Sequence, residues 1–127
     1  MRRNRMTAFS RRLVAETRLD TADLIWPLFV IEGQNMAEPI DTMPGVFRYS
    51  IDQLLQQAAK AVELTIPAIA IFPSIDAALK DGAGSLARDG DNLVCRAVSA
   101  VKAAFPDLGI ICDVALDPCL LYTSDAA

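Results

Sequence analysis

Two aspartates, four residues apart, are the side chains in this sequence best placed to do chemistry. Asp113 and Asp117 lie at the end of the apolar segment 109–116, which has the length and composition of a buried strand. If that strand runs its full length, alternation places both carboxylates on the face of the small Ala115, around one cavity. Mutual repulsion and partial burial would raise the pKa of at least one carboxyl, which suits binding of an amine or cation, or proton transfer. Alternatively, Asp117 and Pro118 merely begin a turn, and Asp113 caps a neighbouring helix.

The other reactive residue types point to less. There is no histidine, which excludes His–Ser and His–Cys nucleophile pairs and every His-ligated metal site. No lysine falls at a predicted strand end, so none is a candidate for a Schiff base. Lys60 and Lys102 are expected on solvated helix faces, and Lys80 is expected in a loop. The three cysteines form no C-x-x-C pair, which predicts neither a disulfide framework nor a zinc site. Cys95 and Cys112 read as small packing residues, and we expect a reduced, cytoplasmic setting.

The elements that must position the aspartates alternate between strand and helix. Continuous apolar runs predict buried strands, and apolar residues at helical spacing predict two helices between them. The expected order is an N-terminal arm (1–23), a strand (24–31), a helix (from Ser50), a strand (66–72), a helix (92–105) and a strand (109–116). This order implies parallel pairing with right-handed crossovers.

Local signals refine the expected boundaries. Pro27 lacks a ladder donor, so the first strand should begin after it or be irregular there. Residues 32–49 read as a loop with a tight turn at Pro44 and Gly45, and residues 74–91 as a long polar loop. Ser50 and Gln53 fit a capping box for the first helix. Asp89 or Asp91 is the expected cap of the second.

Two architectures fit this order: a doubly wound open sheet and a (β/α)₈ barrel. The glycine fingerprint of dinucleotide-binding folds is absent, because Gly82 and Gly84 lie in a loop and do not open a helix. In either architecture, function gathers at the carboxyl ends of the strands, where the two aspartates fall.

Charge and hydropathy exclude several partners. The chain of 127 residues has a net charge of −4, and its apolar runs are too short for a membrane helix. We therefore expect neither nucleic acid nor membrane as a partner, and the Arg-rich start lacks the apolar segment of a signal peptide. Residues 1–18 carry six arginines and one glutamate, a net charge of +5, whereas the rest of the chain carries −9. This basic arm suggests an anionic ligand or an acidic protein surface, or is simply a solvated terminus.

The sequence resembles a known family over residues 1 to about 118. The string DVALDP at 113–118 resembles the strand-end motif of the aspartate-rich delta-aminolevulinic acid dehydratases, also called porphobilinogen synthases. Upstream, MPGV at 43–46 with Arg48 and Ser50 resembles a family landmark. Further matches occur in the family's order: RRLV at 11–14, LFV at 28–30 with EG at 32–33, IPA at 66–68 and FP at 72–73.

The resemblance implies a fold and an activity. It predicts the N-terminal part of a (β/α)₈ TIM barrel, with an extended arm (1–23) that embraces a neighbouring subunit of a homo-oligomer and three strands of the barrel (24–118). Family enzymes condense two molecules of 5-aminolevulinate into porphobilinogen, a precursor of haem and other tetrapyrroles. Asp113 matches an active-site aspartate near the substrate amine, and Asp117 occupies a second site position. The two Schiff-base lysines lie on late strands absent from this segment, so the 127-residue polypeptide should be inactive. Its open strand edges and apolar barrel-facing surface should also make it poorly soluble on its own.

The resemblance also bears on metals and on the end of the chain. In zinc-dependent relatives the two same-face positions after Asp113 are cysteines, but here they are Ala115 and Asp117, so active-site zinc is not expected. Members of the aspartate-rich type often respond to magnesium or potassium, at sites mostly outside this segment. The family continues after Pro118 with an aromatic residue and a T-S-H-G loop, whereas residues 119–127 resemble a translated sequencing adaptor and are read as non-native.

A second hypothesis keeps the α/β fold but not the activity. The chain would be a non-enzymatic interaction module that binds an acidic partner through its basic arm. Reading the DNA beyond the codon for Pro118 separates the two hypotheses. An open frame that continues into an H-G-containing loop and later strand-end lysines indicates the enzyme, and an immediate stop codon indicates the module.

Overall fold

A computed structural model describes residues 3–113 and 115–120, and its centre is one five-stranded sheet. The strand order is β2-β3-β1-β4-β5. Three strands are parallel neighbours and form the main body of the sheet: β1 (Ile25–Val30), β4 (Ala68–Pro73) and β5 (Gly109–Cys112). The helices α2 (Ile51–Glu63) and α3 (Leu93–Ala104) connect them in the expected order. The predicted alternation of strands and helices is therefore confirmed.

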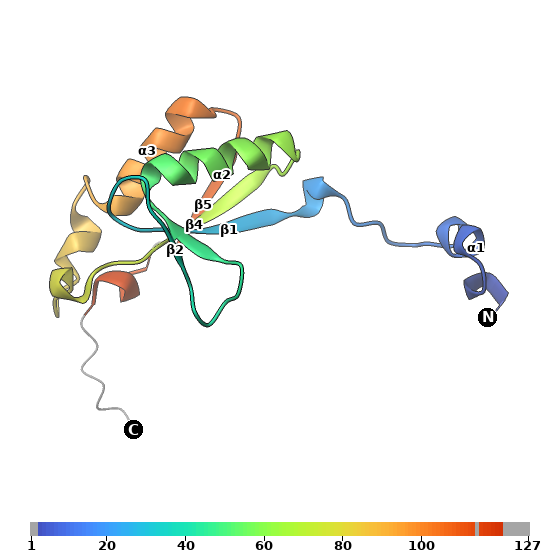
Figure 1. Cartoon of the computed structure of the whole chain (residues 1–127), viewed down its shortest axis with the longest axis horizontal. Helices are drawn as coiled ribbons and strands as arrows, with labels where there is room; N and C mark the ends of the chain where they lie inside the picture. The colour runs from blue at the N-terminus through green and yellow to red at the C-terminus, as the bar shows by residue number, and fades with distance from the viewer. Residues whose placement is uncertain (1–2, 114, 121–127) are drawn as a thin grey trace, which may run out of the picture.

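Both helices cover the same face of the sheet (Figure 1). The core between them is built from fully buried side chains on α2 (Leu54, Ala58), α3 (Ala97, Val101) and the strands (Val30, Ile69, Ile71). The opposite face carries no helix among the described residues. There Phe72, on the inner strand β4, is 38% exposed, and Ile111, on the edge strand β5, is 46% exposed. One face of the parallel strands is thus packed, and the other is apolar and open.

Pro27 lies inside β1, which neither starts after it nor breaks at it. The Ile31 N–H donates to the Tyr49 carbonyl on β3, and the Val30 carbonyl accepts from the Ser74 N–H, which follows β4. Alternation therefore points the Pro27 nitrogen toward the β3 side of the strand. β3 pairs with β1 only at Phe29 and Val30. No described strand therefore lies opposite Pro27 on that side, and the N–H that proline lacks has no acceptor to lose. The expected irregularity was wrong for this reason.

The segment 32–49 holds a hairpin that was expected to be loop. Strands β2 (Ala37–Pro39) and β3 (Phe47–Tyr49) pair antiparallel, and β3 adds to the carboxyl end of β1. The tight turn between them is confirmed. The Val46 N–H donates to the Met43 carbonyl, and Gly45 has a φ of +84°, the left-handed conformation that glycine adopts without strain.

The long polar segment between β4 and α3 is also more ordered than a plain loop. It contains two short 3₁₀ helices, at Ala77–Leu79 and Ser85–Arg88. Asp76 accepts from the Ala78 N–H, and Asp81 accepts from the Ala83 and Ser85 N–H groups. Such turns, in which an aspartate side chain binds nearby backbone N–H groups, stabilise a fixed path for the chain.

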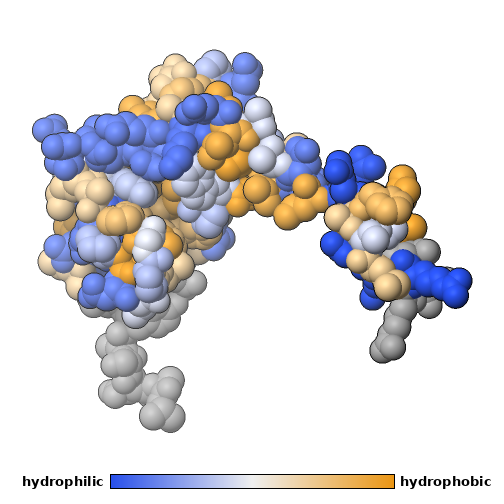
Figure 2. Space-filling view, turned by 45° about the vertical axis from the view of Figure 1, so that its right-hand side comes forward, coloured by the Kyte–Doolittle hydropathy of each residue, from blue (hydrophilic) through white to orange (hydrophobic). Residues whose placement is uncertain are grey.

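The N-terminal arm reaches away from the body of the protein (Figure 1). It contains the short helix α1 (Ala8–Leu13), which has no buried residue. Hydrophobic side chains lie at its surface beside the arginines, as Figure 2 shows, and they include Met6, Phe9, Leu13 and Leu19. Within the described residues, no helix is long and apolar enough to cross a membrane.

Candidate functional site

The candidate site lies at the carboxyl ends of β4 and β5. A hollow of about 360 Å³ opens there, lined mostly by apolar side chains. Its walls come from the end of β4 (Phe72, Pro73), the first turn of α3 (Asn92 to Cys95) and the end of β5 (Cys112, Asp113). This is the edge of a parallel sheet at which α/β folds place their sites.

Asp113 follows the last residue of β5, is exposed and lines this hollow. The partial burial expected for at least one of the two carboxylates is therefore not found at Asp113. The position at the carboxyl end of a parallel strand agrees with the sequence analysis. A solvent-facing carboxylate beside an apolar hollow can attract a cationic group while the hollow holds the apolar part of the same ligand.

Asp117 does not share a strand with Asp113. The strand was expected to run to Leu116, but β5 ends at Cys112, and Asp117 begins a 3₁₀ helix (Asp117–Cys119). Proline fixes a φ near −65° and has no N–H, so Pro118 suits the start of a helical turn rather than a ladder. The placement of Asp113, Ala115 and Asp117 on one strand face is therefore wrong. The alternative, in which Asp117 and Pro118 begin a turn, is what the backbone adopts.

None of the lysines lies at a strand end, as predicted. Lys60 is exposed in the last turn of α2, and Lys80 follows the first 3₁₀ helix of the polar segment. Lys102 has a more specific role than a solvated position. Its Nζ donates to the carbonyls of Pro106 at 3.1 Å and Leu108 at 2.7 Å, which ties the end of α3 to the start of β5.

The three cysteines are free thiols, and all of them line the hollow. Burial raises the pKa of the Cys112 thiol, and the nearby Cys95 raises it further through charge repulsion. Cys112 packs against the core as expected, whereas Cys95 is exposed and is not a packing residue. Among residues 3–113 and 115–120, no three Cys, Asp or Glu side chains are arranged to hold a metal ion.

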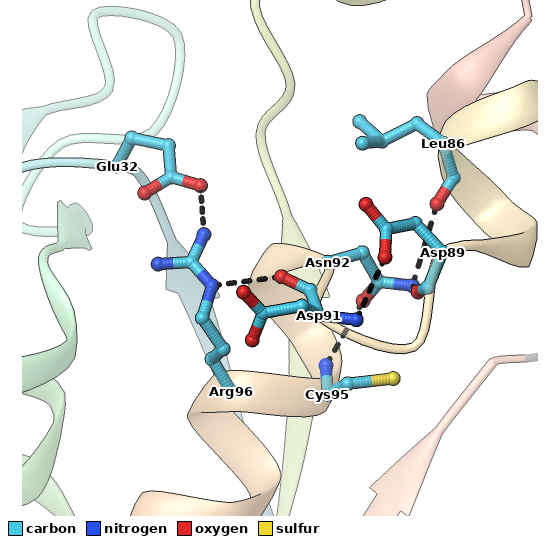
Figure 3. Close-up of polar contacts among 7 residues, drawn as sticks. All are labelled: Glu32, Leu86, Asp89, Asp91, Asn92, Cys95 and Arg96. Carbon is cyan, nitrogen blue, oxygen red and sulfur yellow. Dashed lines mark hydrogen bonds and ion pairs between the residues drawn. The ribbon is translucent and has the colours of Figure 1, made fainter.

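The start of α3 is fixed by Asn92, and not by Asp89 or Asp91, which were the expected caps. The Asn92 Oδ1 accepts from the Cys95 N–H at 2.9 Å, and its Nδ2 donates to the Asp89 carbonyl at 2.8 Å (Figure 3). The Asp89 side chain instead accepts from the Asp91 N–H. Asparagine is among the best N-cap residues, so its identity was a usable signal.

Ser50 and Asp52 hold the loop after β1 against α2. The Ser50 side chain is not a helix cap, because its hydroxyl accepts from the Met36 N–H at 2.9 Å and donates to Asp52 at 2.7 Å. The Asp52 carboxylate also accepts from the Asn35 N–H. The Ser50 hydroxyl, with this N–H, lowers the pKa of Asp52. The predicted capping box was wrong, since Gln53 donates to the Asn35 side chain rather than reaching back to Ser50.

An arginine on α3 connects the loops that follow β1 and β4. Arg96 pairs with Glu32 in the loop after β1. The Arg96 Nε also donates to the Asp91 carbonyl at 2.9 Å, in the loop before α3 (Figure 3). Glu32 and Arg96 are 64 residues apart in the chain, so no sequence spacing could have indicated the pair.

Parallel strands joined by helices on one face, with a site at their carboxyl ends and an open second face, define the N-terminal part of a (β/α)₈ barrel. The family model described as delta-aminolevulinic acid dehydratase matches residues 1–126. The chain belongs to that family.

Individual relatives agree with this assignment. The chain is 55% identical to delta-aminolevulinic acid dehydratase from Bradyrhizobium diazoefficiens over 117 residues, covering 92% of this chain and 33% of that protein. It is 44% identical to the Chlamydia pneumoniae protein of the same name, covering 98% of this chain and 37% of the other. The chain thus spans about a third of the length of these relatives.

A solved structure gives the same result. It is delta-aminolevulinic acid dehydratase (porphobilinogen synthase) from Toxoplasma gondii ME49, in complex with the reaction product porphobilinogen. It matches with a TM-score of 0.88 and 39% identity over 94% of this chain and 34% of that one. The prediction that residues 119–127 are non-native stays a prediction. Cys119 is buried against the hollow, and residues 121–127 lie outside the described residues.

Proposed function

We propose that the parent protein is a porphobilinogen synthase, a hydro-lyase that condenses two molecules of 5-aminolevulinate in tetrapyrrole and haem biosynthesis. The family match over residues 1–126 carries this proposal. The Toxoplasma gondii relative, which is described with porphobilinogen bound, supports the choice of reaction. The chemistry requires neutral amines that attack ketones, and lysines beyond this segment would supply them. No feature of the structure favours the non-enzymatic module.

Asp113 is the residue of this segment to which we assign a direct role. Its exposed carboxylate at the rim of the hollow would bind the ammonium group of a substrate and hold it at the carboxyl end of the strand. Asp117, in the turn that follows, would be the second active-site aspartate. These roles rest on the family motif and on the place of both residues after β5.

Substitution of Asp113 in the full-length enzyme tests this role. Asp113→Asn keeps the size of the side chain and removes its charge, and porphobilinogen formation should fall by roughly a hundredfold or more. Asp107→Asn is the matched control, because Asp107 is also exposed but precedes β5 at its amino end. Equal activity of both variants would remove Asp113 from the site.

The described residues do not build a metal centre. Within residues 3–113 and 115–120, no three suitable side chains come together to hold a metal ion. Magnesium would act in the parent enzyme at sites outside this segment, and active-site zinc is not expected, because Ala115 and Asp117 stand at the two positions that are cysteines in zinc-dependent relatives.

We also propose that the arm mediates a homo-oligomer in the cytoplasm. Helix α1 buries none of its residues against its own chain, while Phe9 and Leu13 stay exposed between arginines. Apolar surface of this kind gains stability when a second copy covers it. Removal of residues 1–18 should lower the mass of the parent protein in solution, as measured by light scattering. An unchanged mass would refute a role for the arm in assembly.

A further inference from the structure

We propose that Arg96 is a positioning residue that holds one wall of the hollow beside Asp113. The inference rests on the proposed function, since it concerns the site at which that reaction would occur. Arg96 does not itself line the hollow. It acts through the loops that follow β1 and β4.

The guanidinium binds both loops at once. One terminal nitrogen pairs with Glu32 after β1, and Nε donates to the carbonyl of Asp91 before α3 (Figure 3). Two donors in a fixed planar fork make this arrangement possible. A lysine has a single nitrogen on a flexible stem and cannot reproduce both contacts with the same geometry.

The loop after β1 is anchored separately at its other end. Asn35 donates its N–H to Asp52, and Met36 donates its N–H to Ser50, which attaches this end to the start of α2. The loop therefore reaches from α2 to α3 across the carboxyl ends of the strands. It contacts α3 through the pair between Glu32 and Arg96.

The Asp91 carbonyl connects Arg96 to the site. Asp91 directly precedes Asn92, and the residues from Asn92 to Cys95 line the hollow together with Asp113. A bond that fixes Asp91 therefore fixes the turn that faces this carboxylate. A displacement of about 1 Å at a reacting site can lower the rate by roughly a hundredfold.

The pair is poorly suited to a role in overall stability. The side chain of Arg96 is 39% exposed and that of Glu32 is 55% exposed. Exposed ion pairs add little to the stability of a fold. A positioning role therefore predicts a loss of rate without a matching loss of stability, and this difference can be measured.

The experiment uses the full-length enzyme with four variants. Arg96→Ala and Arg96→Lys should lower kcat by roughly tenfold, with KM and Tm nearly unchanged. Glu32→Gln should lower kcat in the same direction by a smaller factor, because the Asp91 contact remains. Glu38→Gln is the matched control: Glu38 pairs with Arg48 within the β2–β3 hairpin and is similarly exposed at 54%. Its kcat should equal that of the parent.

Three results would overturn the inference. One is an Arg96→Lys enzyme with the activity of the parent, since charge alone would then suffice. Another is a loss of kcat that is matched by a loss of Tm, which indicates a general structural role. The third is an equal effect of Glu32→Gln and Glu38→Gln.

A failure of the proposed function is recognised separately. If the unsubstituted full-length protein forms no porphobilinogen, that function is wrong, and the inference is then judged by trypsin cleavage after the exposed Arg88 in the β4–α3 loop. Arg96→Ala and Arg96→Lys should speed this cleavage several-fold relative to Glu38→Gln. Equal rates would refute the positioning role.

Discussion

Gly109 stands where the start of β5 lies close against the start of β4, and its replacement by alanine is a sharp test of the sheet. It begins β5 opposite Ala68, the first residue of β4, and donates its N–H to the Pro67 carbonyl at 2.9 Å. A Cβ added to Gly109 would lie 3.0 Å from the Cβ of Ala68 and 3.0 Å from the Pro67 oxygen. The same carbonyl that the glycine binds would thus be crowded by the new methyl group.

The expected cost follows from these distances. Non-bonded carbon atoms prefer separations of about 3.5 to 4.0 Å, so the strands must move apart by several tenths of an ångström. Neither neighbour is the end of a flexible side chain, and overpacking of this kind costs about 1–3 kcal/mol. Replacing glycine by alanine also lowers the conformational entropy of the unfolded chain, which stabilises the folded state by about 0.4–1 kcal/mol. We therefore expect Gly109→Ala to lower the free energy of unfolding by about 1–2 kcal/mol.

Urea unfolding of the parent protein measures this difference. Gly82→Ala is the matched control, because a Cβ at Gly82 meets nothing within 4 Å, and its stability should be unchanged or slightly higher. Ala68→Gly combined with Gly109→Ala should recover part of the loss, since one of the two contacts disappears. If Gly109→Ala is as stable as Gly82→Ala, the close approach of the strands described above is wrong.

Four further predictions concern the cap of α3, the carboxylate of Asp52 on α2, the 127-residue polypeptide and the gene that encodes it. Asn92→Ala should lower the free energy of unfolding by about 1 kcal/mol in a urea titration, because the Cys95 N–H loses its acceptor; an unchanged midpoint would contradict the cap. The lowered pKa of Asp52 means that its contribution to stability is present above the ordinary value of 3.8 and is lost as the pH falls through the lower, folded value. Asp52→Asn should therefore flatten the decline of stability at acid pH, and parallel curves would count against the contacts with Ser50. The purified 127-residue polypeptide should form no porphobilinogen from 5-aminolevulinate and should bind a hydrophobic dye through its open sheet face; activity would refute the first expectation and a sharp cooperative melt the second. Genomic DNA beyond the codon for Pro118 should continue in frame into a His-Gly loop and later strand-end lysines, whereas a stop codon there would favour the binding module.

The main strands and helices could be predicted because each has a local cause. The apolar runs around Leu28 and Ile69 are long enough for buried strands. In each helix the apolar residues recur at helical spacing, and those at the centre of the stripe are buried, such as Leu54 on α2 and Val101 on α3. The hairpin at β2 and β3 could not, because each strand has only three residues and forms by pairing with the other and with the end of β1. Short strands of this kind depend on tertiary partners rather than on their own composition.

The site was less predictable than the fold. The position of Asp113 follows from the order of strands and helices, so it could be inferred before any coordinates. The end of β5 at Cys112 could not, because an apolar segment continues beyond it and only Pro118 hints at a turn. The contact between Glu32 and Arg96 depends on bringing the ends of two loops together, which happens only after the sheet has formed.

The proline within β1 has a consequence for the order in which the protein is made. A chain leaves the ribosome N-terminus first, so β1 emerges before β4 and β5. Until β4 is made, the backbone N–H and C=O groups on that side of β1 have no strand partner. Exposed strand edges recruit other chains, and a proline weakens such an edge because it offers one donor fewer. Since the Pro27 nitrogen faces the side that β4 does not occupy, pairing with β4 keeps all its hydrogen bonds, and the native pairing with β3 on the other side begins beyond the proline, at Phe29 and Val30. A foreign strand that paired with β1 along that side at Pro27 would lose one hydrogen bond, so the proline makes this part of the edge a poorer site for aggregation.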